Sequence, residues 1–421
     1  MENQIITVAI IGCGGRGGGA YGRIMNDSFE GKFQIAALCD ISPDVLYAKA
    51  EQFQVEAENL FLDENIFFEK KRADLLIIAT QDRDHVRMAI KGMQLGYDVL
   101  VEKPLTSSRE ECRQLLNVQK QYGNKVMVCH VLRYAPAFTK TEELLNTGEI
   151  GKLISISVLE QINYLHYAHS YVRGNWHSAE ETSPIILAKC CHDLDLIQHY
   201  ANARCERVSS VGDLSWFKKE NAPQGHADRC IDCQYIETCP YSAKRIYLDN
   251  WKENNEFHFS ALMTYPYPAC EEEIMEGLRE GRYGKCVYSC DNDVADHQMT
   301  VMSFENGVTA TLTLMAFTGN GGRVIRLFGT MGEIILDEEA DFVKIKIYGK
   351  KQKCWKISDL IRHKIGGHGG GDYMLVHDLY DVMTGKMKSP TTLSESVESH
   401  LIGIAAEESR LNNGMLVRVH E

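Results

Sequence analysis

The sequence predicts an α/β fold in which a doubly wound parallel sheet is followed by an α+β domain with an open, mainly antiparallel sheet. Short apolar strand patterns alternate with helical patterns through about residue 130, and this alternation is typical of a parallel sheet covered by helices. A glycine-rich turn, Gly12-x-Gly14-x-x-Gly17, directly follows the first strand. After residue 150 the runs alternate or are rich in β-branched residues, which indicates antiparallel strands.

Length and composition limit the classes of protein to consider. A chain of 421 residues favours two domains over one. The net charge of -13 argues against nucleic acid or an anionic membrane as the main partner. The sequence shows no basic start followed by a long apolar segment, and no apolar run reaches the ~18 residues of a membrane helix. We therefore expect a cytoplasmic protein with no membrane span and no nucleic-acid partner.

The first domain, predicted for residues 1–130, consists of alternating strands and helices. Ser107 and Ser108 precede a helical run whose first turn carries Glu110 and Glu111. Such hydroxyl caps and acidic side chains stabilise a helix N-terminus. The predicted strands are 5–12, 33–39, 74–80, 98–104 and 125–129, and the predicted helices are 16–26, 43–53, 84–95 and 107–122.

The glycine-rich turn predicts a dinucleotide site. Only glycine lets the backbone turn so tightly and approach a pyrophosphate, and free amides at a helix N-terminus favour negative charge. Asp40 ends the second strand, where a carboxylate binds the adenosine ribose and repels a 2′-phosphate. No Arg or Lys follows in residues 41–44, so NAD is predicted in preference to NADP. The predicted phosphate-binding residues are Gly12, Gly14, Gly15, Arg16 and Gly17.

The second domain, predicted for residues 131–421, combines sheet patterns with a few helices. Asn306-Gly307 lies between two strand patterns, and this dipeptide is a strong hairpin signal. The run 307–314 places its threonines on one face. The predicted strands are 152–159, 298–304, 307–314, 323–328, 332–336 and 343–348, and the predicted helices are 184–200, 371–384 and 394–411.

Polar motifs at the ends of predicted strands carry a family resemblance. Glu102-Lys103-Pro104 lies at the carboxyl end of a strand, where ligands bind in doubly wound sheets. Together with four further motifs it resembles the Gfo/Idh/MocA oxidoreductase family, over nearly the whole chain. Those motifs are the glycine turn with Arg16, Thr80-Gln-Asp-Arg-Asp-His85, Arg133-Tyr-x-Pro136 and Gly148-Glu-Ile-Gly151.

The resemblance implies a Rossmann NAD(P) domain and a C-terminal sheet that commonly makes the contact of a homodimer or homotetramer. It implies hydride transfer between the nicotinamide and a sugar, an inositol or a related polyol. The lysine matching Lys103 touches the substrate hydroxyl and the cofactor, and the histidine matching His192 serves as base. Histidine can accept a proton near neutral pH, and a nearby ammonium stabilises an alkoxide. Thr80, His85 and Glu102 are implied to join the cofactor site.

The segment before His192 departs from the family pattern. Many members have an aspartate four residues before this histidine, where the chain has Ala188, followed by Lys189. The segment resembles a family branch with Ala-Lys-x-x-His. Residues three and four apart share a face of a helix, so Lys189 is expected beside His192 and near Asp193. We expect either a catalytic contact between Lys189 and substrate or an ion pair between Lys189 and Asp193.

A polar and aromatic loop after the first strand of the second domain is predicted to contact substrate. It carries His166, His169, Arg173 and Trp176, which supply donors for hydroxyl oxygens and a flat face for a sugar ring. Packing of this loop against the cofactor domain is the alternative. Further substrate candidates are Arg133, Asp296 and His297, of which the last two equally suit turn and capping roles.

A glycine-rich segment precedes the first of the two C-terminal helices. Five of the seven residues in 366–372 are glycine, which predicts a mobile loop that ends at a helix cap, Asp372. The loop can lie over the active site or be a flexible connection only, and both interpretations stay open.

A cysteine-containing insertion is predicted at about residues 215–297. Cys230, Cys233 and Cys239 follow a Cys-x-x-Cys-x5-Cys pattern, which suits a structural tetrahedral zinc site. An iron–sulfur cluster would use similar spacing, and three reduced cysteines without metal are the plain alternative. The candidates for a fourth ligand are His226, Cys270, Cys286 and Cys290.

The residues and the resemblance together predict an NAD-dependent dehydrogenase of a sugar or polyol. A glycosidase that oxidises its substrate transiently with bound NAD is the second interpretation, because the same fold hosts such enzymes. A non-catalytic NAD-binding sensor or scaffold is the third, and the presence of Lys103 and His192 speaks against it.

Overall fold

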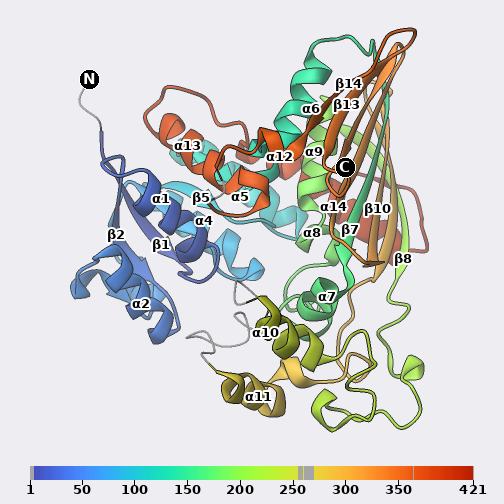
Figure 1. The fold of residues 1–421 in the computed structure, drawn as a ribbon. Coiled ribbons are helices and arrows are strands. Elements are labelled where there is room, and N and C mark those ends of the chain that lie inside the picture. The colour runs from blue at the N-terminus through green and yellow to red at the C-terminus, as the bar shows by residue number, and fades with distance from the viewer. Residues whose placement is uncertain (1–3, 255–258, 260–269, 364, 421) are drawn as a thin grey trace.

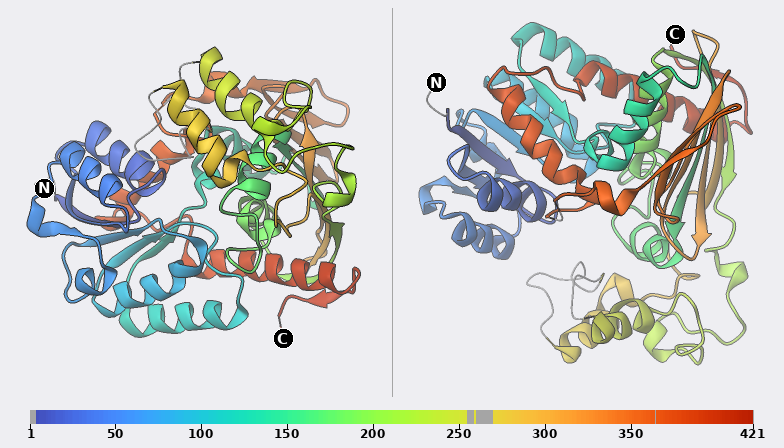
Figure 2. Two further views of the ribbon diagram at one scale, coloured as in Figure 1. Left: turned by 90° about the horizontal axis from the view of Figure 1, so that it is seen from below. Right: turned by 45° about the horizontal axis from the view of Figure 1, so that its top comes forward.

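The computed structural model describes residues 4–254, 259, 270–363 and 365–420. Two sheets dominate it, one near the N-terminus and a larger one that carries most of the second half of the chain (Figure 1). Helices from the end of the chain lie between and beside the two sheets (Figure 2). Within the described part of the chain, no helix is long and apolar enough to span a membrane.

The first sheet is parallel and has six strands in the order β3-β2-β1-β4-β5-β6. This order reverses beside β1, as in doubly wound dinucleotide-binding sheets. The predicted parallel sheet is thereby confirmed. The strands are β1 (Ile6–Ile11), β2 (Phe33–Cys39), β3 (Leu60–Phe61), β4 (Leu75–Ile78), β5 (Asp98–Val101) and β6 (Val126–Val128).

Helices cover both faces of this sheet, and their ends follow local signals in the sequence. Ser108 accepts a hydrogen bond from the amide of Glu111, which caps the N-terminus of the helix that Gly123 ends in a left-handed conformation. The helices are α1 (Arg23–Ser28), after a π-helical turn η1 (Gly17–Gly22), α2 (Pro43–Phe53), α3 (Glu64–Phe67), α4 (His85–Gln94) and α5 (Arg109–Tyr122). The short elements α3 and β3 were not predicted, because each spans only about one period of its pattern.

The second sheet has nine strands in the order β14-β13-β12-β11-β7-β10-β9-β8-β15, and β7 and β10 form its parallel pair. The predicted hairpin at Asn306-Gly307 is confirmed, since β9 and β10 are antiparallel and Gly307 has a φ of +84°. The strands are β7 (Leu153–Asn163), β8 (Cys205–Asp213), β9 (His297–Phe304), β10 (Thr309–Thr318), β11 (Gly322–Gly329), β12 (Gly332–Asp337), β13 (Phe342–Ile347), β14 (Lys353–Lys356) and β15 (Val417–Arg418).

The C-terminal helices connect the two sheets. Leu375 and Leu379 pack into one apolar cluster of the first sheet, and Leu393 and Val397 pack into the other. The last third of the chain therefore contributes to the core of the first domain, which strand patterns alone do not reveal. The helices that follow the strands of the first sheet, outside the cysteine-containing insertion, are α6 (Pro136–Asn146), α7 (Tyr164–Tyr167), α8 (Ile185–Ala188), α9 (Cys191–Ala201), α12 (Ile357–Leu360), α13 (Gly371–Met383) and α14 (Leu393–Leu411).

The predicted helix 184–200 is wrong as a single element. The chain forms α8 and α9, and Lys189 and Cys190 lie between them. Lys189 has a φ of -107° and Cys190 a ψ of 7°, both outside the helical values. This break changes which residues share a face and leaves the carbonyl groups at the end of α8 in need of donors.

The cysteine-containing insertion leaves and re-enters the second sheet at one point. Asp213 at the end of β8 pairs with His297 at the start of β9, so residues 214–296 form an excursion between neighbouring strands. In Figure 2 (right) this segment projects below the sheet. Its helices are α10 (Asn250–Asn254) and α11 (Glu271–Glu280), with a π-helical turn η8 (Lys244–Asp249) before them.

Candidate active site

The glycine turn after β1 has the shape that a bound pyrophosphate requires. Gly12 has a φ of +85°, and a Cβ atom there would lie 2.4 Å from the carbonyl oxygen of Ala79. A Cβ atom at Gly17 would lie 2.0 Å from the carbonyl oxygen of Gly12. Gly14 and Gly15 are exposed and have open space in front of them. The turn is thus packed closely on its inner side and open on its outer side, which fits a dinucleotide phosphate.

Asp40 lies directly beside this turn. One of its carboxylate oxygens accepts a 2.7 Å hydrogen bond from the amide of Cys13, and the other accepts a 2.8 Å bond from the amide of Ser42. The backbone therefore holds the carboxylate at the carboxyl end of β2. A ribose diol can still bind there, because a carboxylate has about four acceptor positions.

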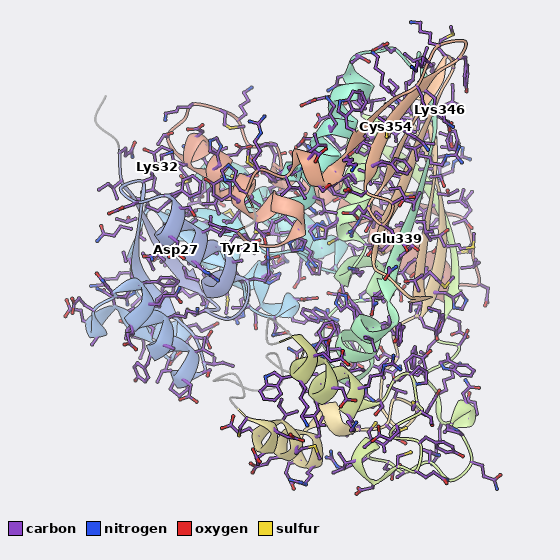
Figure 3. All side chains as sticks on the ribbon, in the orientation of Figure 1. Tyr21, Asp27, Lys32, Glu339, Lys346 and Cys354 are labelled. Atoms are coloured by element: carbon purple, nitrogen blue, oxygen red, sulfur yellow. The ribbon has the colours of Figure 1, made fainter. Side chains whose placement is uncertain are left out.

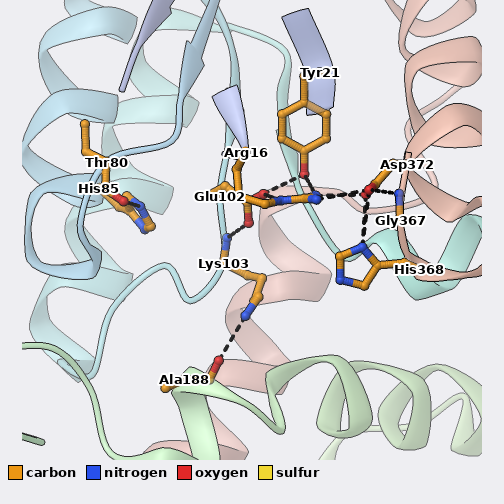
Figure 4. Close-up of polar contacts among 10 residues, drawn as sticks. All are labelled: Arg16, Tyr21, Thr80, His85, Glu102, Lys103, Ala188, Gly367, His368 and Asp372. Carbon is orange, nitrogen blue, oxygen red and sulfur yellow. Dashed lines mark hydrogen bonds and ion pairs between the residues drawn. The ribbon is translucent and has the colours of Figure 1, made fainter. Parts of the chain in front are cut away.

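Thr80 and His85 join the loops after β4 and β5. The buried His85 ring contacts the carbonyl oxygen of Pro104 at 2.7 Å through Nδ1, and that of Thr80 at 3.2 Å through Nε2. Both ring nitrogens thus face backbone carbonyl oxygens, and a neutral ring donates to one of them; Figure 4 shows His85 beside Thr80. We interpret His85 as a residue that positions the loop of Lys103 rather than as a direct contact of the cofactor.

A charged network connects the glycine turn with the glycine-rich segment near the C-terminus (Figure 4). The Arg16 guanidinium donates to Glu102 at 2.7 Å and to both oxygens of Asp372 at 2.8 and 3.0 Å. The Tyr21 hydroxyl donates to Glu102 at 2.6 Å. Burial by itself would raise the pKa of Glu102, but the charges of Arg16 and Lys103 hold it below its usual range.

The same network places His368. Asp372 accepts a 2.8 Å bond from the amide of Gly367 and contacts His368 Nδ1 at 3.2 Å. His368 in turn lies with its ring centroid 5.9 Å from that of His192. The glycine-rich segment thus lies beside the predicted base. The sequence analysis did not identify His368 or Tyr21 as site residues. The only indication in the sequence was the cluster of glycines around His368.

Lys103 links the first sheet to the break between α8 and α9. Its ammonium donates a 2.9 Å hydrogen bond to the carbonyl oxygen of Ala188, the last residue of α8 (Figure 4). Its backbone amide donates to Glu102 at 3.0 Å. A cation at a helix C-terminus satisfies a carbonyl group that has no partner within the helix. Lys103 is therefore held at the segment that leads to His192.

His192 is buried. Burial lowers its pKa well below the usual value, and the nearby charges of Lys103 and His368 add to this effect. Its Nδ1 atom has no hydrogen-bond partner among the described residues. Its ring also lies 6.1 Å from the ring of His130, whose two nitrogens equally lack partners in the described part of the chain. Burial thus favours the neutral form of both imidazole rings, and each neutral ring has one nitrogen free to accept a proton.

His130, Cys191 and His192 lie close enough to share an ion. Their possible ligand atoms all lie within 4.8 Å of one another. Among the described residues, this is the one group of at least three His, Cys, Asp or Glu side chains that lie so close together. Positive charge from Lys103 and Arg133 acts on His130, and its pKa is lowered to about 3, mainly by burial. These cations disfavour a metal ion at this cluster.

Lys189 does not lie on the face of α9 and does not pair with Asp193. Its ammonium lies 3.1 Å from the buried carboxylate of Glu160 on β7. Asp193 instead pairs with Arg323 at 2.7 Å, and Arg323 also contacts Glu160 at 3.0 Å. The expected Lys189–Asp193 ion pair is therefore wrong, because the helix break turns Lys189 toward β7.

The loop that follows β7 has two parts with different surroundings. Burial lowers the pKa of His166 to about 3, and the charge of Lys189 adds to this effect, followed by those of His169 and Lys103. His166 is thus close to the charged groups around His192. Trp176 instead donates through Nε1 to Asp82 at 3.2 Å. This contact supports the alternative in which the end of the loop packs against the cofactor domain.

His169 and Arg173 face the insertion rather than Lys103. His169 contacts the Tyr247 hydroxyl at 3.0 Å and stacks on Tyr283 with ring centroids 5.0 Å apart. The Arg173 guanidinium donates to the carbonyl oxygens of Lys285 and Tyr241. Most of their polar atoms are used within the protein, and Arg173 Nη1 is the one guanidinium nitrogen without a hydrogen-bond partner among the described residues.

The three remaining substrate candidates also have internal partners. Arg133 donates to Pro390 at 2.7 Å and to Asp195 at 3.5 Å. Asp296 accepts from the amides of Ser215 and Trp216 and contacts His297 Nδ1 at 2.8 Å. These contacts favour the turn and capping roles for Asp296. His297 is partly exposed on β9.

Comparisons with known proteins point to one family. Two family models match: "Oxidoreductase family, NAD-binding Rossmann fold" over residues 6–130, and "Oxidoreductase family, C-terminal alpha/beta domain" over residues 142–419. Putative oxidoreductase YteT of Bacillus subtilis is 22% identical over 369 residues, which cover 84% of this chain and 83% of YteT. The 2,7-anhydro-N-acetylneuraminate hydratase of Mediterraneibacter gnavus is 26% identical over 264 residues, which cover 61% of this chain and 63% of the hydratase.

A solved structure shows the same fold. Levoglucosan dehydrogenase in complex with NADH and levoglucosan has a TM-score of 0.71 at 17% identity, and the match covers 99% of this chain and 100% of the dehydrogenase. The two family matches together span nearly the whole chain, and they coincide with the motifs at the glycine turn and at Lys103. The chain therefore belongs to the Gfo/Idh/MocA family of NAD-binding oxidoreductases.

Proposed function

We propose that this protein is an NAD-dependent dehydrogenase that oxidises a hydroxyl group of a sugar or polyol, or runs the reverse reduction. One arrangement carries the proposal: Lys103 donates to the carbonyl oxygen of Ala188 at the end of α8, four residues before the buried His192. A neutral imidazole next to an ammonium is the pair that alcohol oxidation requires. The fold relationship to a dehydrogenase solved with NADH and levoglucosan supports the substrate class.

The residues of the first sheet suit the cofactor. Gly14 and Gly15 would hold the pyrophosphate, Asp40 the adenosine ribose, and the segment of Lys103 would face the nicotinamide. When bound, NAD accepts the hydride from the substrate carbon. The fixed negative charge of Asp40 would repel a 2′-phosphate, and this is our reason to propose NAD rather than NADP.

The chain's own residues account for the proton. As the substrate carbon loses its hydride, the hydroxyl proton passes to a ring nitrogen of His192, which burial keeps free of protons. The Lys103 ammonium stabilises the alkoxide character that develops on the oxygen. Arg16, Glu102 and Asp372 hold Lys103 and the glycine-rich segment in place. The charge of Lys189 acts on His166, and these two residues are our candidates for substrate contacts.

A substrate screen tests the proposal. Sugars, inositols and related polyols are each incubated with the protein and NAD, and NADH formation is followed by absorbance, with NADP in parallel. We expect turnover with NAD and a lower kcat/KM with NADP. Loss of turnover in His192→Asn with retained NAD binding would support the role of the base. Turnover that persists in His192→Asn would contradict it.

A redox-neutral reaction is the second candidate function. The relative from Mediterraneibacter gnavus is named a hydratase, and a hydration leaves the overall oxidation state of its substrate unchanged. The NAD-using glycosidase of the sequence analysis belongs to the same class, in which oxidation is transient. Copurified NAD that is not released, with product formed and no net NADH, would favour this candidate over a dehydrogenase.

We also propose that the outer face of the large sheet mediates self-association. Val211 on β8 and its partner Met299 on β9 are both more than half exposed, as is Val301. Neighbouring exposed apolar side chains on one sheet face are typical of an interface. Light scattering coupled to gel filtration would test this, with Val301→Lys expected to shift a dimer or tetramer toward the monomer. An assembly unchanged by that charge would contradict the proposed face.

A further inference from the structure

The predicted metal ligands of the insertion do not form a tight group. Cys230, Cys233 and Cys239 line one cavity together with Cys286, but in the described part of the chain no three of these side chains have their sulfur atoms within 4.8 Å of one another. This lining does not fit one tetrahedral metal ion, so the described geometry does not support the predicted zinc site. The tight group that the fold does assemble lies beside His192.

A row of ionisable side chains leads away from His192 along one face of α9. His192, Asp195 and His199 occupy positions i, i+3 and i+7 of this helix, and residues at this spacing share a face. His130, two residues after β6, lies against that face, because its Nε2 atom is 4.0 Å from Asp195 Oδ1 and its ring is 6.1 Å from that of His192. We call these four residues and Glu142 the α9 row.

The inner part of the α9 row is deeply buried and has polar atoms without partners. His130 is 0% exposed and Asp195 is 1% exposed. Among the described residues, neither nitrogen of His130 has a hydrogen-bond partner, nor does His192 Nδ1 or Asp195 Oδ2. Buried polar atoms normally make hydrogen bonds, and ordered water satisfies those that the protein does not. These atoms therefore point to bound water between the side chains, because a packing role alone would suit apolar rings better.

The first gap in the row has the length that one water bridges. The possible ligand atoms of His130 and His192 lie within 4.8 Å of each other, yet these nitrogens do not hydrogen-bond each other. A water between two such atoms makes hydrogen bonds of ordinary length to both. The Cys191 thiol lies within the same distance of both rings. Burial raises its pKa to about 12, so the thiol keeps its own proton.

The outer end of the row reaches a cavity. His199 Nε2 contacts Glu142 Oε1 on α6 at 2.9 Å, and both side chains are partly exposed. Glu142 and Arg133 line a cavity of about 530 Å³, which holds many waters. The described residues that line it include neither Lys103 nor His192. The cavity therefore gives the row contact with solvent at a place other than the proposed substrate site.

Alcohol oxidation requires an exit for a proton. For each hydride that leaves the substrate carbon, one proton leaves the hydroxyl group, and His192 is the proposed acceptor. Substrate and cofactor cover this ring during the reaction and exclude water from it. The ring must lose the proton before it can deprotonate the next substrate. A route through the protein interior meets this requirement.

We propose that the α9 row carries the substrate proton from His192 through His130 and Asp195 to the cavity beside α6. This inference rests on the dehydrogenase function proposed above. At each step an N–H or O–H bond breaks as the next one forms, so one proton moves and no electrons are transferred. The proton leaves to solvent from His199 and Glu142, the outer members of the row.

The inner members suit transient carriage of a proton. Burial lowers the pKa of His130 to about 3, so the proton stays on this ring only briefly. Burial raises the pKa of Asp195, which lets the carboxylate accept a proton more readily than an exposed aspartate. Arg133 contacts Asp195 at 3.5 Å. It keeps its charge, because a guanidinium does not lose a proton in proteins, and so it only holds the carboxylate in place.

Replacing His130 by Phe tests the route, because Phe keeps a ring in this place and removes both nitrogens. Rapid mixing with NAD and the best polyol of the screen would follow NADH formation. We expect the first turnover to keep its rate and KM to stay unchanged, while kcat falls about 10-fold or more and gains a solvent deuterium isotope effect. Asp195→Asn should show the same pattern. A residue that only supports packing would instead slow the first turnover or raise KM.

His377→Gln and Cys354→Ser are the controls and should keep kcat. His377 lines the same cavity without belonging to the row, and Cys354 lies on the edge strand β14 of the large sheet (Figure 3). Equal kcat in His130→Phe and in the unmodified chain would overturn the route and leave the dehydrogenase function standing. No NADH from the unmodified chain with any polyol would overturn both.

A crystal structure of the unmodified chain gives a test that needs no turnover. It should show an ordered water within about 3.2 Å of a nitrogen of His130 and of a nitrogen of His192. The same water should be missing in His130→Phe. The absence of water between the two rings in the unmodified chain would overturn the route, as would a metal ion bound there by His130, Cys191 and His192.

Discussion

The ammonium of Lys103 and the carbonyl oxygen of Ala188 are 2.9 Å apart and join the nucleotide-binding sheet to the end of α8. The helix break after Ala188 is what makes this carbonyl oxygen available. Without the break, α8 and α9 would be one helix, and the carbonyl would bond the amide of residue 192. The same break places Lys189 on the side of β7. One local departure from helix geometry thus organises the candidate site.

Replacing Lys103 by Met should reduce kcat by about 10²-fold or more, because the developing alkoxide loses its ammonium. NAD affinity should change much less, since the glycine turn and Asp40 are untouched. Lys120→Met, at an exposed position on α5, is the matched control and should behave as the unmodified protein. Steady-state kinetics with the best substrate of the screen would measure both. A Lys103→Met variant with full turnover would contradict the proposed role.

Replacing Asp40 by Ser should raise the preference for NADP, measured as the ratio of kcat/KM values for NADP and NAD. Removing the carboxylate removes its repulsion of a 2′-phosphate and its bonds to the ribose, so a change of about 10-fold or more is expected. Asp44→Ser, at an exposed position in the first turn of α2, is the control. If both variants showed the same ratio, Asp40 would not be the selecting residue.

Replacing Lys189 by Met should raise KM for the substrate and lower stability by about 1–2 kcal/mol. The stability loss follows because the buried Glu160 then keeps Arg323 as its one ion-pair partner among the described residues. The double variant Lys189→Met/Glu160→Gln should recover part of the lost stability, but its KM should stay as high as in Lys189→Met. Urea denaturation and kinetics separate the two effects. A KM that returns to normal in the double variant would show that Lys189 acts only through Glu160.

Replacing Asp372 by Asn should destabilise the protein by about 2 kcal/mol and raise KM for NAD. Asp372 is fully buried and pairs with Arg16, which lies within the glycine turn; the exposure of Arg16 makes the loss smaller than for a fully buried pair. Asp378→Asn on the same helix, whose contact is with the exposed His377, should have little effect. Thermal unfolding with and without NAD would distinguish the two variants.

Stability should fall as the pH is lowered below about 6.5. Burial lowers the pKa of four histidines to about 3, namely His130, His166, His169 and His400. The unfolded chain takes up protons on these side chains near pH 6.5 while the folded chain does not, so the stability they contribute is complete above that pH and lost below it. The free energy of unfolding should fall by up to about 1.4 kcal/mol per pH unit for each of these histidines.

Urea midpoints at about pH 7.5 and about pH 5.5 would measure this dependence. The variant His400→Gln should have a smaller difference between the two midpoints, because one buried imidazole is gone. The exposed His377→Gln should leave the difference unchanged. Equal midpoints at both pH values in the unmodified chain would contradict the prediction.

Several parts of the fold could be predicted because local pattern determines them. The alternation before residue 130, the Asn306-Gly307 hairpin and the Ser108 cap each depend on a few consecutive residues, and each is confirmed. The break at Lys189 could not be predicted, because residues 184–200 carry a continuous helical pattern. It depends on partners from elsewhere, of which the Lys103 side chain and Glu160 are the clearest.

The sequence by itself determined the two sheets, the glycine turn and the family, since strand periodicity and glycine positions reflect the backbone directly. Only the tertiary structure decided which partners the charged side chains meet: Arg16 with Asp372, Asp193 with Arg323, and Arg173 with the sulfur of Cys230. These partners are separated by 57 to 356 residues. No local pattern encodes such pairs, because buried charges choose whichever opposite or polar group the folded chain brings within reach.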